Sequence, residues 1–518
     1  MRIASWILAF PVVHLLGVGV AYADSPAKAE PNESREPDGS EEPRNVVVIG
    51  DEAASPDLGP PSAPTTFQLG DYTLRPTASL RLRGEYRREP PEAGGRTMLA
   101  LGSMAPAGPV VRDAGGISER VRLGLGADRG PLSLQVTLQD ARIWSAPRTA
   151  TFIGGAAGRF GLYQAYFEAH TEGQNVSFFR AGRQAIDWGD GTLLSSADWA
   201  PTGRALDSVR GRFAAKNFRL EALAAFLEGP TPYGLTGSDL AGPPSFGIQL
   251  YGALARYTPL PLLGFELMSL VRVSRSANGS DGSYFDAARA FGERATVSAR
   301  IFGADDTFRY SAFGAFQFGE VGANGASIAA WMAKANVEKT FDSVYWDPTV
   351  AVGGTVASGH DGGTVYRQFD PLLPDVHRFH GLSDLFGSSN IGDVHGSVAV
   401  IPTEETRLAL EYRYLRFFDS SGEWISAYTT TIGRGATSTD LGHEIDLSFR
   451  WRLWKKLDID AQYSLLVLGD GAKSVMSRMG RTTSELTQGS LGTVSPGGLT
   501  QTADLAQMAL LQATLRVP

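Results

Sequence analysis

Apolar and polar residues alternate along much of the chain after about residue 67. In "GHEIDLSFRWRLW" (442–454), Ile445, Leu447 and Phe449 fall on one face, while Glu444 and Asp446 fall on the other. Successive side chains of a strand point to opposite faces, so this period of two predicts amphipathic β-strands. The same pattern recurs in "ASLRLRGEYR" (78–87), "ERATVSARI" (293–301), "TRLALEYRYL" (406–415) and "LDIDAQYSL" (457–465).

The joints between these strands predict how they are arranged. The three residues "WKK" (454–456) join two long strands, whereas "RSANGSDGSYFDAARAFG" (275–292) is a long, Gly-rich joint. Short turns at one end and long loops at the other are typical of outer-membrane barrels. A soluble β-sandwich also alternates, but its strands are usually shorter. About 450 residues, at about 25 residues per strand with its share of loop, correspond to roughly 18 strands.

The predicted fold class is therefore all-β, a transmembrane antiparallel up-and-down β-barrel of the outer membrane. A barrel of this size encloses an aqueous lumen instead of a packed core. Aromatic residues near strand ends are expected to form interfacial girdles. They are Trp451, Trp454, Tyr412, Phe417 and Phe418.

The N-terminal sequence predicts export from the cytoplasm. Residues 1–23 combine Arg2, an apolar stretch and the sequence Ala21-Tyr22-Ala23, which is typical of a signal peptide cleaved after Ala23. Residues 24–66 form an acidic, Pro-rich segment that we expect to be disordered, and residues 67–518 form the barrel. The chain has no cysteine, which excludes disulfides, thiolate metal sites and a lipoprotein anchor. We expect the mature protein in the outer membrane of a Gram-negative bacterium.

The barrel region is nearly neutral in total charge but rich in arginine. Residues 24–64 hold ten acids and three bases, a net of −7; subtracting this and Arg2 (+1) from the total of −8 leaves about −2 for the barrel. Lysine occurs seven times, so arginine supplies 40 of the 47 basic residues. Arginine rings in a pore favour anions, and the planar guanidinium suits carboxylate and phosphate oxygens. The alternative is that these arginines pair with inward acids and have a structural role.

The segment "FFRAGRQAIDWGDGTLLSSADWAPTGRALDSVRGRF" (178–213) contains two predicted strands and a charged loop. We expect Val176, Phe178 and Phe213 on a lipid or interface face. Asp187, Asp190 and Asp198 could pair with Arg183 and Arg204 and fold the loop inward as a gate, or the loop could be a compact extracellular one. The predicted pore-lining and substrate-binding residues are Arg83, Arg122, Arg183, Arg210, Arg212, Arg300, Arg413, Asp187 and Asp190.

Two blocks of sequence resemble the alginate-export family of outer-membrane β-barrels. The first is "AGRQAIDWGDGTLLSSADWAPTGRALDSVR" (181–210). The second is "DPTVAVGGTVASGHDGG" (347–363) followed by "QFDPLLPDVHRFHGLSDLFGSSNIGDVHGSVAV" (368–400). The family's Ser-Gly-Asp segment is one residue longer here, Ser358-Gly359-His360-Asp361. The resemblance implies a barrel that passes an anionic polysaccharide such as alginate.

The predicted function is a porin-like channel for an anionic polysaccharide or related small anionic solutes. The alternative is an occluded structural or adhesive barrel without transport. Outer-membrane lipid and the anionic solute are the expected partners, together with a periplasmic secretion partner; nucleic acid is not expected. We predict no enzymatic activity, metal or cofactor, since "HRFH" (377–380) and the nearby Ser383 match no catalytic or metal-ligand motif.

The mature protein is expected to begin at Asp24, because the small residues Ala21 and Ala23 fit signal-peptidase cleavage. N-terminal sequencing of the membrane-inserted protein tests this. Finding residues 1–23 still attached would contradict it.

Overall fold

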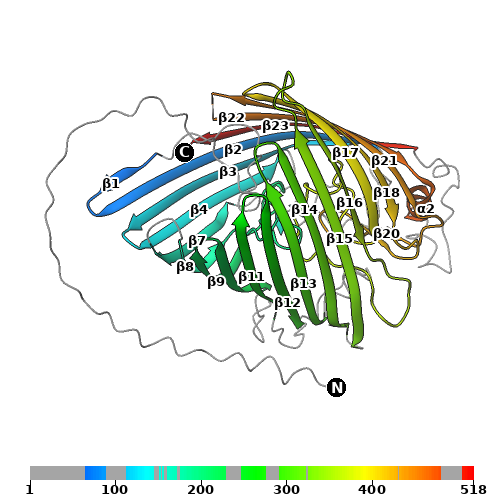
Figure 1. Ribbon diagram of the computed structural model, residues 1–518, viewed down its shortest axis with the longest axis horizontal. Coiled ribbons are helices and arrows are strands. Elements are labelled where there is room, and N and C mark those ends of the chain that lie inside the picture. The colour runs from blue at the N-terminus through cyan, green and yellow to red at the C-terminus, as the bar shows by residue number, and fades with distance from the viewer. Residues whose placement is uncertain are drawn as a thin grey trace. The chain divides into compact units, whose positions relative to one another are not determined.

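A computed structural model describes most of the barrel (Figure 1). The described residues are 65–88, 113–144, 151–152, 155–156, 160–171, 176–228, 247–275, 291–322, 325–429, 431–454, 456–479 and 504–517. The predicted signal peptide (1–23) lies outside them, as does all but the end of the predicted acidic segment (24–66). Both assignments stay predictions.

Eighteen long strands form one antiparallel sheet. They are β2 (Tyr72–Arg88), β3 (Asp113–Arg129), β4 (Leu132–Ile143), β7 (Gly161–His170), β8 (Phe178–Gln184), β9 (Leu206–Ala215), β10 (Phe218–Glu228), β11 (Ile248–Leu260), β12 (Leu263–Arg275), β13 (Phe291–Ala304), β14 (Phe308–Val321), β15 (Ala326–Thr340), β16 (Thr349–Ala357), β17 (Ile391–Thr403), β18 (Thr406–Phe417), β21 (Asp440–Leu453), β22 (Leu457–Leu468) and β23 (Leu505–Val517). The shorter elements are β1 (Phe67–Leu69), β5 (Thr151–Phe152), β6 (Gly155–Ala156), β19 (Glu423–Ile425), β20 (Thr431–Arg434) and the helix α2 (Asp470–Met479).

The sheet closes through its first and last long strands. Strand β2 pairs with β3 on one side and with β23 on the other, where the register runs from Ala78↔Val517 to Arg88↔Gln507. Each of the other long strands pairs with its two neighbours along the chain, so the eighteen strands leave no open edge among themselves. The short β1 pairs with β2 beyond the end of β23. The predicted up-and-down barrel of about 18 strands is confirmed.

The two ends of the barrel differ in their connections. Turns of two residues join β3 to β4 (130–131), β9 to β10 (216–217) and β11 to β12 (261–262). At the other end, long segments such as 185–205 and 358–390 join β8 to β9 and β16 to β17. In outer-membrane barrels short turns face the periplasm and long loops the exterior. We call these the turn end and the loop end.

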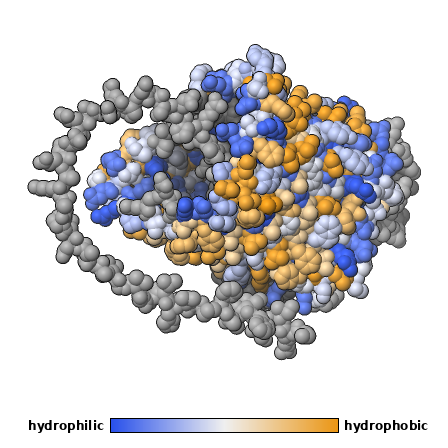
Figure 2. All heavy atoms as spheres, viewed as in Figure 1, coloured by the Kyte–Doolittle hydropathy of each residue, from blue (hydrophilic) through white to orange (hydrophobic). Residues whose placement is uncertain are grey.

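The two faces of the wall follow the predicted alternation. Ile445, Leu447 and Phe449 of β21 point outward and are 40%, 44% and 36% exposed, whereas Glu444 and Asp446 point inward and are buried. Apolar residues also gather on the outer surface over the middle strands (Figure 2). Leu267 of β12 and Phe316 of β14 are among the exposed apolar residues. Such a surface has no partner in water and fits the lipid of a bilayer.

Two predicted outward aromatics lie inside the barrel. Phe417 is buried near Trp424, so it is not part of a girdle, although Trp451, Trp454, Tyr412 and Phe418 are exposed. Phe178 is also buried, beneath the guanidinium groups of Arg210 and Arg212, and its neighbour Phe179 faces outward instead. Within the described part of the chain, no helix is long and apolar enough to cross a membrane.

Replacing Leu447 by Arg is expected to lower the free energy of unfolding by about 2–4 kcal/mol, because the side chain lies outward midway along β21. Denaturant unfolding in lipid vesicles measures the change. The control is Leu453→Arg, on the same face at the end of the same strand, where the cost falls to about 0–1 kcal/mol. Equal costs for both variants would contradict a membrane-embedded outer face.

Candidate functional site

Two long loop-end segments fold back into the barrel and form its candidate site. In residues 185–205, Trp188, Leu193 and Leu194 are almost completely buried. Trp188 donates its indole N–H to Glu221 on the inner face of β10, at 2.9 Å. In residues 358–390, the carbonyl of Asp370 accepts a hydrogen bond from the Gln317 side chain of β14, at 2.6 Å. Both segments therefore occupy the lumen.

The two segments also bind each other through their backbones. Ser195 N donates to Leu373 O at 2.8 Å, and Leu373 N donates to Leu193 O at 3.1 Å. The guanidinium of Arg204 donates to the carbonyls of both Ser195 and Leu373, at 2.9 and 2.8 Å. The Trp199 and His377 rings stack with centroids 3.6 Å apart. The segments thus form one unit inside the barrel.

Four inward arginines of β2 and β3 hold this unit against the wall. We call Arg81, Arg83, Arg120 and Arg122 the arginine cluster. Arg81 donates to the carbonyls of Asp198 and Ala200, both at 2.8 Å, and Arg83 donates to that of Trp199 at 2.8 Å. The carbonyls of five consecutive residues, 198–202, accept hydrogen bonds from the cluster. These carbonyls accept hydrogen bonds from the guanidinium groups without neutralising their charge, although the buried Nε of Arg120 has no partner among the described residues.

Asp198 supplies the one carboxylate that is ion-paired with this cluster in the described residues. Its two oxygens lie 3.0 Å from Arg120 Nη2 and 2.5 Å from Arg122 Nη1. Burial alone would raise the pKa of the Asp198 carboxyl, but Arg120, Arg122 and Arg81 hold it well below its ordinary value. Four guanidiniums and one carboxylate give these five groups a net charge of +3.

A second group of charges lies around Asp190. Lys334 Nζ of β15 is 2.7 Å from Asp190 Oδ2. Burial would raise the pKa of Asp190, but Lys334 and Arg300 hold it well below its ordinary value. Glu266 of β12 pairs with Arg256 at 2.6 Å and with Arg300 at 3.1 Å. Among the described residues, Nε and Nη1 of the buried Arg300 have no hydrogen-bond partner.

The other predicted arginines have acidic partners on the wall. Arg210 and Arg212 of β9 both bind Glu221, at 2.5 and 2.9 Å. Arg413 of β18 binds Asp393 at 2.9 Å and Glu411 at 2.5 Å. These inward arginines are paired with acids of the wall. This is the structural role that the sequence offered as the alternative to an anion-selective pore lining.

Arg183 does not line the lumen, and its prediction as a pore residue is wrong. It pairs across the strands with Asp207, at 3.1 Å, on the face that carries the exposed Phe179 and Val209. Arg180 is the inward residue, paired with Glu168 at 2.5 Å. Strand β8 spans only Phe178–Gln184, so its sequence alternation was too short to fix which face is inside.

Segment 185–205 folds into the barrel, as one of the two hypotheses for this loop predicted. Its three acids, however, bind residues other than the predicted arginines. Asp187 accepts hydrogen bonds from Ser195 Oγ and Ser196 N, at 2.8 and 2.7 Å. Asp190 pairs with Lys334, and Asp198 with Arg120 and Arg122. The predicted pairing of these acids with Arg183 and Arg204 is therefore wrong. Sequence reasoning missed Lys334 and Arg120, although Arg120 alternates with Arg122 in "ERVRLG".

His380 forms a hydrogen-bonded chain that the sequence did not indicate. Its Nε2 lies 2.8 Å from Ser388 Oγ, and its Nδ1 lies 2.5 Å from Asp393 Oδ2. All three side chains are buried, and Asp393 also binds Arg413. The chain ties segment 358–390 to β17. Ser383 instead binds Glu444, at 3.0 Å. Within the described residues, no group of three or more His, Asp or Glu could hold a metal ion.

Residues 256–483 match the model of the alginate export family. The predicted resemblance is confirmed, and its second block (347–400) lies inside the matched residues, whereas the first (181–210) lies outside them. No curated protein matches the chain. The chain resembles this family over the matched residues, and it is a β-barrel of the Gram-negative outer membrane.

The solved structures that resemble the model are distant in sequence. OccK11 of Pseudomonas aeruginosa has 10% identity and a TM-score of 0.48, covering 86% of this chain and 96% of its own. The outer membrane protein OprD of the same organism has 9% identity, coverage of 85% and 94%, and a TM-score of 0.48. OccAB2 of Acinetobacter baumannii has 11% identity, coverage of 86% and 98%, and a TM-score of 0.49.

Acidification is expected to release the part of segment 358–390 around His380. Burial lowers the pKa of His380, outweighing the neighbouring Asp393, while Arg413 and Lys334 lower it further. The neutral ring is thus favoured in the docked state, and its stabilising contribution is lost as pH falls below about 6.5, the ordinary value.

Hydrogen exchange of peptides within residues 375–390, corrected for intrinsic rates, measures this release in the folded protein. Protection should fall between about pH 7.5 and pH 5.5 in the native protein and change little in His380→Gln. Equal protection of the native protein at both values would show that His380 does not control docking.

Proposed function

We propose that this barrel passes an anionic polysaccharide such as alginate, or related anionic solutes, with selectivity from its lumenal arginines and inward-folded loops. The match to the alginate export family supports the substrate class. The observation that carries the proposal is the arginine cluster. Its four guanidiniums lie on the wall of the lumen, and one carboxylate, that of Asp198 in segment 185–205, is ion-paired with them. A guanidinium binds carboxylate oxygens with two parallel hydrogen bonds, so uronate groups fit this surface.

The inward segments determine how the cluster is presented to a solute. Arg122 is the most exposed member, with its side chain 15% exposed, whereas Arg120 is 6% exposed. Residues 198–202 cover the other three more completely, and their carbonyls occupy hydrogen bonds that a solute would use; among the carbonyls of this segment, Arg122 donates only to that of Thr202, at 3.4 Å. Arg122 is therefore the member that acts first on a passing anion, and a shift of 198–202 exposes the rest.

The occluded barrel without transport remains the second candidate, because the loop-end half of the lumen contains an apolar core. Trp188 and Leu194 of one segment and Phe369 of the other pack there with inward residues such as Leu254 and Leu270. Packing of this kind excludes water and ions. A periplasmic secretion partner stays a prediction under either function, as does the absence of enzymatic activity.

Conductance across a planar lipid bilayer distinguishes the two functions. A channel gives discrete steps and a reversal potential that favours anions, most strongly at low salt, because 0.1 M salt screens charges beyond about 10 Å. An occluded barrel gives no steps in the native protein.

Arg122→Gln is expected to reduce the preference for anions over cations, because it removes one of the four charges of the arginine cluster. Arg183→Gln is the matched control: this arginine also pairs with an aspartate, but on the outer face. The permeability ratio from reversal potentials at low salt measures both. Equal effects of the two substitutions, or none in Arg122→Gln with conductance intact, would show that the cluster does not select the solute.

A further inference from the structure

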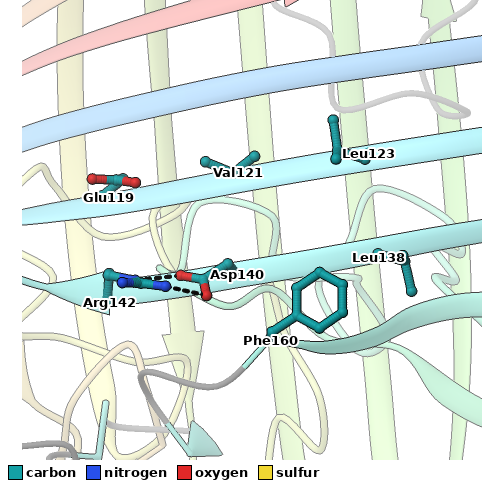
Figure 3. A pocket seen from close by; sticks show the side chains of 7 residues that line it. All are labelled: Glu119, Val121, Leu123, Leu138, Asp140, Arg142 and Phe160. Carbon is teal, nitrogen blue, oxygen red and sulfur yellow. Dashed lines mark hydrogen bonds and ion pairs between the residues drawn. The ribbon is translucent and has the colours of Figure 1, made fainter.

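A hollow lies on the outer face of the barrel near its loop end. Its volume is about 250 Å³, and Figure 3 shows the seven side chains that line it. Strand β3 contributes Glu119, Val121 and Leu123, β4 contributes Leu138, Asp140 and Arg142, and Phe160 precedes β7.

The hollow faces the membrane and not the lumen. Arg120 and Arg122, which alternate with its β3 residues, bind segment 185–205 inside the barrel. Gln139, which alternates with its β4 residues, binds the Thr202 carbonyl there, at 2.9 Å. Neighbouring residues of a strand point to opposite faces, so the lining residues of β3 and β4 point outward. Any occupant must come from the outer leaflet of the bilayer.

The polarity of the hollow changes along the strands. The cross-strand pairs run from Leu123↔Leu138 through Val121↔Asp140 to Glu119↔Arg142, toward the loop end. At 3.3 Å per residue, the step from 123 to 119 spans roughly 13 Å. The apolar floor thus lies toward the middle of the membrane and the charges toward its outer surface, as an amphiphilic lipid requires.

The charged rim offers both a donor and acceptors. Arg142 lies beside Asp140, with Nε 2.5 Å from Oδ1, and its side chain is 56% exposed. Glu119 accepts a hydrogen bond from the indole of Trp144, at 2.9 Å. A guanidinium binds phosphate, while carboxylates accept hydrogen bonds from hydroxyl and amide groups. The rim has two carboxylates and one guanidinium, so its net charge is negative. It therefore disfavours a head group that offers only negative charge.

We infer that this hollow binds a phosphorylated glycolipid of the outer leaflet. One acyl chain fills the apolar end against Val121, Leu123, Leu138 and Phe160. The phosphate binds Arg142, and the sugar hydroxyl and amide groups donate to Glu119 and Asp140. A phospholipid whose head group is a bare phosphate lacks the sugar donors and fits the rim less well. The inference depends on the outer-membrane location of the barrel and not on what passes through it.

Leu138→Trp is expected to fill the hollow and to weaken binding of purified lipid A at least about tenfold, since the acyl chain loses its buried site. The matched control is Leu134→Trp, which is on the same outward face of β4 but does not line the hollow. Native mass spectrometry of the delipidated full-length protein, titrated with lipid A, measures both. Equal binding by the two variants would overturn the inference.

A second variant tests the head group and does not change the apolar floor. Arg142→Gln should weaken binding of lipid A but not of its dephosphorylated form. Phosphatidic acid, whose head group is a bare phosphate, should bind the native protein more weakly than lipid A. If it binds as tightly, the site is a general acyl-chain groove and the assignment to a glycolipid is wrong. Bilayer conductance should be unchanged in Leu138→Trp, so this test and that of the proposed function fail independently.

Discussion

Pairing of every backbone N–H and C=O within the sheet is the constraint on which the rest of this molecule depends. Hydrocarbon offers no hydrogen-bond partners, so a spanning sheet must close on itself. Strand β2 meets this requirement by pairing with both β3 and β23, the strand that is last in the chain. Closure fixes which face of each strand is inside, and therefore collects the polar residues of eighteen strands around one lumen.

Closure places several arginines close together on the inner wall, and the inward loops supply hydrogen-bond acceptors for many of their donors. Arginines outnumber acids on β2 and β3, and buried guanidiniums without hydrogen-bond acceptors are costly. Residues 198–202 supply five neutral carbonyls to them. These carbonyls accept hydrogen bonds from the cluster without reducing its positive charge. Elsewhere, as with Glu221 between Arg210 and Arg212, an acid on the wall has the same role and reduces the charge.

The sequence predicted the parts of the structure that depend on local pattern. The alternation in "GHEIDLSFRWRLW" identified the outward Ile445, Leu447 and Phe449, and the length of the barrel region predicted the number of strands. It failed where a strand is short: β8 gave too few residues to show that Phe178 and Arg180 face the lumen. It also failed for partners distant in sequence. Asp190 binds Lys334 from a strand on another part of the wall, and no local pattern relates the two.

The packing of segments 185–205 and 358–390 against each other has a consequence for how the barrel assembles. Leu194 and Leu373 are neighbours although strands β9 to β16 lie between them in the chain. Contacts between residues so far apart in the chain form slowly, because a long loop must close before they stabilise anything. Filling of the lumen therefore has a larger entropic cost of loop closure than pairing of neighbouring strands in the wall.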